Sequence, residues 1–402
     1  MIYLDHAAAT PVCKKAIEAM TPYFADDFFN PSAAYLPAKK VSADYEAAKG
    51  VIAHTIGAKT SDLVITAGAT EANNLAFTSM SSDGSCWSFS SPTSQSSVGD
   101  PLHDHHPSVL YLVTEHDSVR RVAERYGGMS VKVLKNGVID LEDLKAKITD
   151  ETELISISLV NNELGTIQPL TEVSQIVREV RFDRLKRGVK RQLLLHSDAS
   201  QALNLLDISV ARLGVDLLTL NAAKVYGPKG VGALYVAHGV RLSPLNYGGG
   251  QENGLRSGTE NVPGVIGFAK AVELAKEHLN GNRKKYAEWR KILVDGLLDC
   301  EIINKKHTLD NFVVVCFDGL DAERLIYLLE EKEVYVSTGA ACAASKGVRS
   351  HVLSAIGLSD SQIAGSLRIT LGETNDEAQI REAVKIINEA TLKERERIKA
   401  SA

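Results

Sequence analysis

Short apolar runs alternate with amphipathic segments through the first two thirds of the chain. Apolar runs of about four to eight residues bounded by turn residues are typical of buried strands, whereas apolar positions three and four apart are typical of helices. The runs predict six strands, at 63–66, 109–113, 154–159, 193–196, 217–220 and 231–236. Because helical segments lie between several of these strands, we expect an α/β layer built on a mostly parallel sheet.

The pattern changes near residue 262. A helical pattern covers 262–298, apolar runs at 311–317 and 334–337 predict short strands, and another amphipathic helix is predicted over 377–399. A chain of 402 residues also exceeds the ~250–300 residues at which single cores stop growing. We therefore expect two domains: a large α/β domain over 14–260, and a smaller α+β domain formed by 1–13 together with 261–402.

Two segments interrupt this plan, and no internal repeat is present. Residues 79–108 are rich in serine and carry three prolines and three histidines. A polar surface loop is the favoured interpretation, and a metal site is the weaker one. Residues 176–192 combine apolar positions at helical spacing with many arginines and lysines. A charged helix face is usually only solvated, so a partner-binding role for this segment is also the weaker interpretation.

The composition is that of an ordinary globular protein, with 44% hydrophobic and 24% charged residues. The formal net charge of −5 argues against nucleic acid as a direct partner. The five cysteines contain no C-x-x-C pair, which argues against a disulfide framework and a zinc site. No apolar run approaches the ~20 residues that span a bilayer, and no signal peptide is recognisable. We expect a cytoplasmic protein without a membrane segment and without a bound metal.

Polar side chains follow five of the predicted strands. Ligands of parallel α/β sheets bind beyond the carboxyl ends of the strands, so these side chains are expected to form one site. The residues that follow the first strand, Gly68 to Thr70, open a helix and suit an anion, because free backbone N–H groups and the helix dipole point toward it. The other strands are followed by His116, Asn162, Asp198 with Gln201, and Lys224.

This combination suits pyridoxal 5′-phosphate. That cofactor needs a lysine, a carboxylate that keeps its pyridinium nitrogen protonated, and a phosphate site at a helix N-terminus. Lys224 directly follows an apolar strand, where burial lowers the pKa of an amine and favours its role as nucleophile and base. The chain has neither G-x-G-x-x-G nor a P-loop, which argues against a dinucleotide or ATP site.

The sequence closely resembles the cysteine desulfurase family, pyridoxal-phosphate enzymes of the aspartate-aminotransferase fold type. The resemblance covers nearly the whole chain outside the two interrupting segments. It rests on motifs at 3–11, 30–32, 68–76 (GATEANNLA), 114–116 (TEH), 160–166 (VNNELGT), 198–201 (DASQ), 224–230, 248–252, 256–261, 337–342 and 366–372. It implies fold type I: a mostly parallel seven-stranded sheet flanked by helices, with a smaller α+β domain that carries a catalytic-cysteine loop at 337–350.

The resemblance also implies roles for individual residues. Lys224 would form the Schiff base with the cofactor and take the Cα proton, Asp198 would face the pyridine nitrogen, and His116 would stack on the ring and shuttle protons. Ala69, Thr70 and Asn221 would bind the phosphate. Gln201 and Asn162 would hold the phenolic-oxygen side of the ring, and Arg368 and Asn162 would bind the substrate carboxylate. Thr259 would reach the phosphate of the neighbouring subunit, which implies a homodimer.

Cys342 is the expected nucleophile. It lies among small residues typical of a mobile loop, and ten positions separate it from Val352. That long loop resembles the branch of the family that donates sulfur to flexible partners such as cluster scaffolds and tRNA-thiolating enzymes. The other four cysteines, at positions 13, 86, 300 and 316, are expected to be inert.

We therefore expect a cysteine desulfurase that converts L-cysteine to L-alanine and leaves a persulfide on Cys342. An acceptor protein in iron–sulfur cluster assembly or tRNA thiolation would then take the sulfur. Two alternatives stay open: a selenocysteine lyase or aminotransferase on the same fold, and a weakly active scaffold subunit. The second is favoured only by Asn221 and Ala223, which replace the usual serine and histidine. Tyr35, which replaces another usual histidine, is a further departure from the family pattern.

Overall fold

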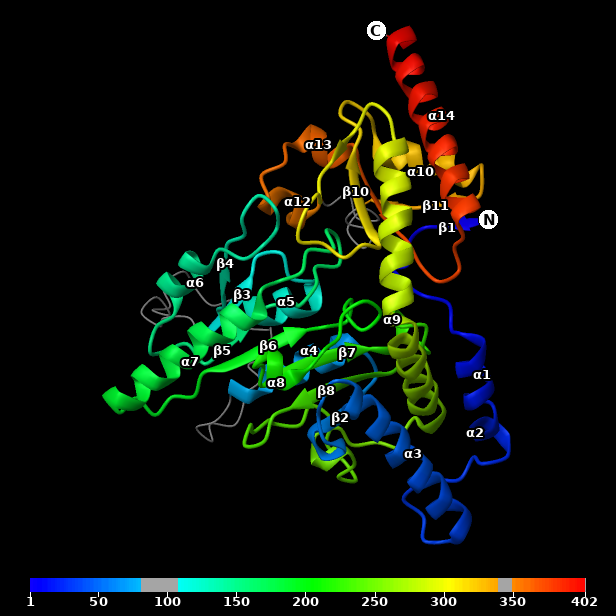
Figure 1. Ribbon diagram of the computed structural model, residues 1–402. Helices are drawn as coiled ribbons and strands as arrows, with labels where there is room; N and C mark the ends of the chain where they lie inside the picture. Colours follow the sequence, from blue (N-terminus) through cyan, green and yellow to red (C-terminus); the bar gives the residue numbers. More distant parts are fainter. Residues whose placement is uncertain (81–107, 339–348, 402) are drawn as a thin grey trace, which may run out of the picture.

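The computed structural model describes residues 1–80, 108–338 and 349–401 of the chain (Figure 1). Cys342, Cys86 and the three histidines of the serine-rich segment lie outside the described residues. The largest element is a seven-stranded sheet with the strand order β2-β8-β7-β6-β5-β3-β4. Its strands are β2 (Leu63–Thr66), β3 (Val109–Leu112), β4 (Met129–Val131), β5 (Leu154–Ser156), β6 (Leu194–Asp198), β7 (Leu217–Asn221) and β8 (Gly232–Val236).

Only β8 runs against the other strands of this sheet. The predicted mostly parallel sheet is therefore confirmed, including its number of strands. The apolar pattern missed β4, a short edge strand whose Met129 is exposed. It also ended β6 two residues early, so Asp198 is the last residue of that strand rather than part of the following loop.

Helices cover both faces of the sheet. On one face, Val64 and Tyr111 belong to a buried cluster with residues of α4 (Ala69–Phe77) and α5 (Asp117–Arg125). On the other, Leu63 and Leu110 belong to a cluster with α3 (Leu36–Thr55), α7 (Leu170–Arg187) and α9 (Val262–Gly296). Strands buried on both faces have nearly continuous apolar runs, which is why the sequence pattern revealed them.

A second, four-stranded sheet is antiparallel, with the order β12-β13-β10-β9. Its strands are β9 (Glu301–Ile302), β10 (Phe312–Cys316), β12 (Ser337–Thr338) and β13 (Ser366–Thr370). A parallel pair, β1 (Ile2–Tyr3) with β11 (Val334–Tyr335), joins the start of the chain to this part. The single strand predicted over 334–337 is wrong, because β11 and β12 belong to different sheets.

The long helix α9 packs on α1 (Lys14–Met20) and α3 beside the large sheet, and on β10 and α14 (Glu377–Ser401) beside the small one (Figure 1). The remaining helices are α2 (Pro22–Ala25), α6 (Leu141–Lys147), α8 (Val210–Leu213), α10 (Ala322–Glu330), α12 (His351–Ala355) and α13 (Asp360–Ala364). We propose a domain division in which 1–13 and 261–402 form the small domain. No helix among the described residues is long and apolar enough to cross a membrane.

The basic segment at 176–192 is only partly helical. Helix α7 ends at Arg187, because Gly188 adopts the left-handed conformation (φ 75°) that commonly terminates helices. The predicted helical continuation to residue 192 is therefore wrong. Phe182 and Leu185, whose spacing had suggested an apolar face, are exposed.

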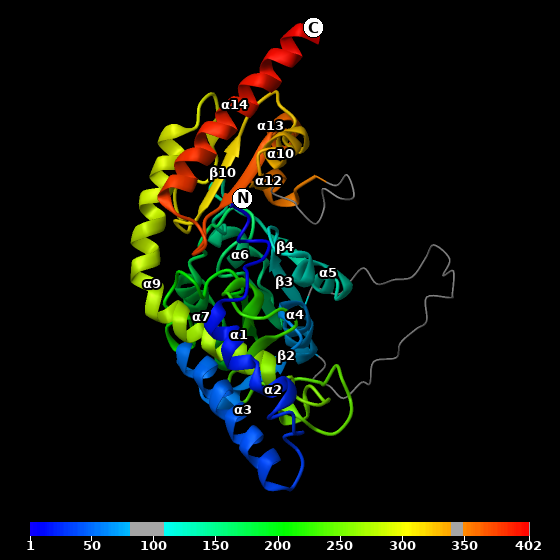
Figure 2. The ribbon, with the colours of Figure 1, turned by 90° about the vertical axis from the view of Figure 1, so that its right-hand side faces the viewer.

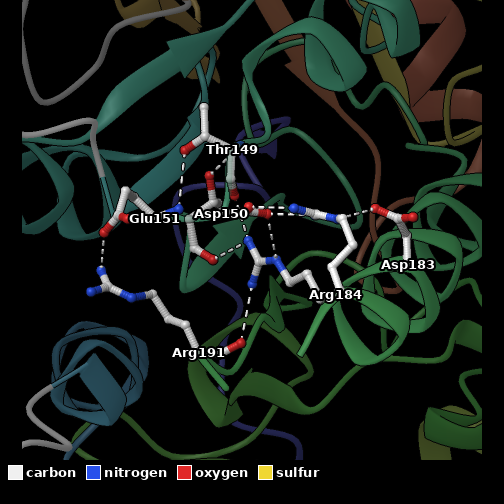
Figure 3. Close-up of polar contacts among 8 residues, drawn as sticks. Thr149, Asp150, Glu151, Asp183, Arg184 and Arg191 are labelled. Atoms are coloured by element: carbon white, nitrogen blue, oxygen red, sulfur yellow. Dashed lines mark hydrogen bonds and ion pairs between the residues drawn. The ribbon is translucent and has the colours of Figure 1, made fainter. Parts of the chain in front are cut away.

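Most of the arginines in this segment contact acidic residues or carbonyl groups (Figure 3). The buried Arg184 donates to the carbonyl oxygens of Thr149 (2.5 Å), Thr152 (2.8 Å) and Arg191 (3.3 Å). Arg187 binds Asp150 through both terminal nitrogens, and the Arg191 guanidinium lies 2.6 Å from Glu151. The segment is thus largely neutralised within the chain, which weakens its interpretation as a basic binding surface.

We predict that Arg184→Ala lowers the free energy of unfolding by about 2–4 kcal/mol, because it removes a charged donor from one buried and two partly buried carbonyl groups. Arg178→Ala is the matched control, since Arg178 is exposed on the same helix and donates to Ser174. Urea unfolding of both variants measures the difference. Equal midpoints for the two variants would show that the carbonyl contacts of Arg184 contribute no stability.

Candidate active site

The N-terminal segment runs from β1 to α1 (Figure 2), and residues that follow β6 and β7 contact it on the way. Lys224 ends a single 3₁₀ turn that follows β7, and its Nζ donates to the carbonyl oxygens of Ala7 (2.8 Å) and Ala8 (2.5 Å). Gln201, which comes from the loop after β6, donates to the same Ala7 oxygen at 3.0 Å. The structure thus brings these two predicted residues together through the backbone of residues 7–8.

Asn221 caps the turn that carries Lys224. Its Oδ1 accepts a hydrogen bond from the backbone N–H of Ala223 at 3.2 Å. On the other side of the turn, the Ala223 carbonyl accepts from both the backbone and the hydroxyl of Thr10, each at 3.1 Å. Asn221 therefore performs a capping role that a serine could also fill, and its amide nitrogen is the group that faces away from this cap.

Asp198 is the last residue of β6, and His116 lies beyond the end of β3. The Asp198 carboxylate is 8% exposed and accepts hydrogen bonds from the Asn73 side chain (2.8 Å) and from the Ser200 backbone (2.9 Å). His116 is the exposed N-cap of α5, and its Nδ1 accepts from the backbone N–H of Ser118 at 3.1 Å. Asn73 was missed by the sequence analysis, although it lies within the GATEANNLA motif and is fully buried.

Arg368 extends from β13 toward the N-terminal segment. It is 3% exposed and forms an ion pair with Asp5 at 2.7 Å. Its other terminal nitrogen donates to the carbonyl of Asn162 at 2.9 Å. The structure therefore places the predicted substrate-binding pair, Arg368 and Asn162, in direct contact. The role of Asp5 was missed, although it lies within the motif at 3–11.

The helix start at Ala69 and Thr70 has the features expected of an anion cradle. No side chain caps the first turn of α4, and Gly68 has φ 144°, a conformation that side chains rarely adopt. A Cβ on Gly232 of the adjacent strand would come within 2.7 Å of Gly68, so the backbones approach as closely as glycine allows. Uncapped N–H groups at the positive end of a helix dipole fit a phosphate.

Thr259 does not join this cluster within the chain. It is exposed, in a glycine-rich loop that two ion pairs attach to helices α3 and α4. Arg256 contacts Glu71 of α4 at 3.0 Å. Glu252, whose side chain is 5% exposed, binds Lys49 at 2.8 Å and also accepts from the backbone of β2.

The chain on both sides of the Cys342 segment contacts the site. Before it, Ser337 and Thr338 of β12 pair with Arg368 and Leu367. After it, the Ser350 hydroxyl donates to Glu163 at 2.5 Å, and the His351 ring lies 2.9 Å from the Glu115 carbonyl oxygen. One end of the segment is therefore fixed to strand β13, which carries Arg368, and the other end to the loops that carry Asn162 and His116.

Two buried carboxyl groups lie behind these loops. Burial raises the pKa of Glu115 to about 8, and the nearby Asp198 adds to the increase. Glu115 accepts from the Ser158 backbone through Oε1 and has no partner among the described residues at Oε2. Burial also raises the pKa of Glu163, to about 7. Neither residue was singled out from the sequence, because the burial of a loop carboxylate cannot be inferred from a strand pattern.

These groups fit pyridoxal 5′-phosphate: Lys224 provides an amine, Asp198 a hydrogen-bonded carboxylate, and α4 an uncapped N-terminus. They would hold the aldehyde carbon, the ring nitrogen and the phosphate of the cofactor, respectively. Among the described residues, no group of three or more His, Cys, Asp or Glu side chains could hold a metal.

The model of the class-V aminotransferase family matches residues 2–86 and 94–382. The chain belongs to this family. It is 35% identical to the cysteine desulfurase IscS of Methanosarcina thermophila, over 98% of this chain and 92% of that protein. A solved structure of a NifS-like protein superposes with a TM-score of 0.84 at 31% identity, covering 96% of this chain and 98% of that one.

Another solved structure, of SspA in complex with cysteine, has a TM-score of 0.75 at 33% identity and covers 92% of this chain and 99% of that chain. Together these matches confirm the expected membership in the cysteine desulfurase group and the fold type I architecture. Members of the group depend on pyridoxal 5′-phosphate, so the predicted cofactor is also confirmed.

We predict that Glu115→Gln removes part of the pH dependence of stability. A carboxyl group whose pKa is raised on folding stabilises the protein fully below its unfolded value of 4.5, and this contribution is lost as the pH rises through about 8. The variant should therefore gain stability relative to the wild type by up to about 1.4 kcal/mol per pH unit over this interval.

Unfolding of the cofactor-loaded wild type and variant between pH 5 and 9 measures this difference. Glu301→Gln is a control, because Glu301 is exposed on β9. A stability difference that stays constant across the pH range would contradict a raised pKa for Glu115.

Proposed function

We propose that this chain is a cysteine desulfurase, which uses pyridoxal 5′-phosphate to convert L-cysteine to L-alanine and keeps the sulfur as a persulfide on Cys342. The observation that carries the proposal is the convergence of Lys224, Asp198, His116 and Arg368 at one sheet edge, beside both ends of the segment that contains Cys342. Family membership supports the same reaction.

Each step of the proposed reaction is assigned to particular residues of the chain. The Lys224 amine removes the Cα proton of the substrate, while Asp198 keeps a proton at the ring nitrogen. The bound cofactor supplies an electron sink for the pair left at Cα. Arg368, oriented by Asp5 and by the Asn162 carbonyl, binds the substrate carboxylate, and His116 transfers protons at the substrate.

The Cys342 thiolate attacks the substrate sulfur. The S–S bond forms as the C–S bond breaks, and the carbon fragment takes up protons and leaves as L-alanine. Ser337 and Thr338 precede the segment beside Arg368, and Ser350 and His351 follow it beside Glu163 and Glu115. This attachment supports Cys342 as the nucleophile, because the segment starts beside Arg368 and ends beside the chain neighbours of Asn162 and His116.

We further propose a homodimer in which the exposed Thr259 reaches the phosphate site of the partner subunit. An acceptor protein, either a cluster scaffold or a tRNA-thiolating enzyme, would take the persulfide sulfur. The long spacing after Cys342 supports transfer to such partners. The cytoplasm is the proposed compartment.

The first test is a single turnover of the cofactor-loaded protein with L-cysteine and without reductant. Mass spectrometry should find one added sulfur on the Cys342 peptide, and quantitation should find an equal amount of alanine. We expect Cys342→Ser to abolish the added sulfur and to slow alanine formation at least about 100-fold, because the nucleophile is lost. Cys300→Ser, at a half-buried free cysteine, is the control and should retain both products.

Alanine formation that survives Cys342→Ser would overturn the nucleophile role and favour lyase or aminotransferase chemistry. Neither product from cofactor-loaded wild type would favour the scaffold alternative.

A further inference from the structure

Asn73 lies on α4 behind the site and has no role in the reaction described above. It is fully buried, and its side-chain nitrogen lies 2.8 Å from Asp198 Oδ2 and 2.8 Å from Ser118 Oγ. Its Oδ1 has no partner among the described residues. One amide nitrogen thus connects the carboxylate expected at the ring nitrogen with the first turn of helix α5.

The orientation of this amide follows from its neighbours. An ionised carboxylate only accepts hydrogen bonds, so a flipped amide would place Asn73 Oδ1 against Asp198 Oδ2. The NH₂ group must therefore face Asp198. Because Nδ2 contacts both Asp198 and Ser118, it uses one hydrogen for each.

The hydrogen bond from Asn73 to Ser118 Oγ determines the direction of the hydrogen bond between Ser118 and His116. Ser118 Oγ accepts from Asn73, so its own hydrogen is available to His116 Nδ1, 2.9 Å away. The backbone N–H of Ser118 also donates to Nδ1, at 3.1 Å. With two donors directed at Nδ1, this nitrogen carries no hydrogen, and the neutral ring is protonated at Nε2.

We propose that Asn73 is a positioning residue that holds the Asp198 carboxylate and, through Ser118, keeps neutral His116 in the Nε2-protonated form. The proposal deepens the proposed function and rests on it for the roles of Asp198 and His116. In this form the Nε2–H of neutral His116 meets the substrate as a hydrogen-bond donor.

The tautomer can be read directly in the wild type. In protein selectively labelled with ¹⁵N-histidine, with the His116 signals assigned by their loss in His116→Gln, the neutral ring should show hydrogen on Nε2. Hydrogen on Nδ1 would overturn the link to His116. This measurement does not depend on turnover.

The link to Asp198 is tested with Asn73→Leu, a substitution of similar size without a donor. The dissociation constant for pyridoxal 5′-phosphate should rise about 10- to 100-fold, since a hydrogen bond to a charged group is lost. In the loaded enzyme, kcat should fall about tenfold or more, with little change in the KM for L-cysteine. Asn74→Leu is the matched control, because Asn74 follows on the same helix and, within the described part of the chain, donates only to the Thr70 carbonyl.

Ser118→Ala breaks the link from Asn73 to His116 but leaves the hydrogen bond between Asn73 and Asp198 in place. Ser118 is only partly buried. The substitution should lower kcat and leave cofactor affinity unchanged. Combined with Asn73→Leu, it should lower kcat less than the product of the single effects, because both changes break the same connection. Fully multiplicative effects, or unchanged cofactor affinity in Asn73→Leu, would overturn the proposal. A wild type that binds the cofactor, shows the Nε2 tautomer and makes no alanine would refute the proposed function instead.

Discussion

The ion pair between Arg368 and Asp5 connects the two halves of the candidate site. Asp5 lies on the segment whose Ala7 and Ala8 carbonyls hold Lys224 and Gln201, and Arg368 lies on the central part of the small sheet. A buried guanidinium is costly unless it is paired, so the small sheet and the N-terminal segment must keep a fixed relative position. That position determines where the substrate carboxylate, the reacting amine and the ring meet.

Much of the fold could be predicted from the sequence, because six strands of the large sheet are buried over most or all of their length and appear as apolar runs. The exceptions have physical reasons. Strand β4 is an exposed edge strand without an apolar run, and β11 and β12 are two residues each, too short for any period to be recognised. The apolar pattern also could not predict the end of β6, since Asp198 is buried although it is polar.

The site residues that follow strands could be predicted from their chemistry and from the family motifs. The residues that support them could not, because their roles depend on contacts between distant segments. Asp5, Asn73, Glu115 and Glu163 illustrate this: each contacts a residue more than 40 positions away. The opposite error occurred at α7, where a basic pattern suggested a surface for partners. There the arginines bind nearby carboxylates and carbonyls, and a count of charges along one helix cannot reveal such pairing.

The long separation between Asp5 and Arg368 also bears on how the protein is made. The two residues are 363 positions apart, and β1 pairs with β11, which is nearly as distant. On the ribosome, the first ten residues emerge long before the strands that receive them, so they stay without their native partners during most of translation. The large sheet can form earlier, from strands that all precede residue 240. Because it needs Arg368, substrate recognition therefore arises only after the chain of the large sheet has been made.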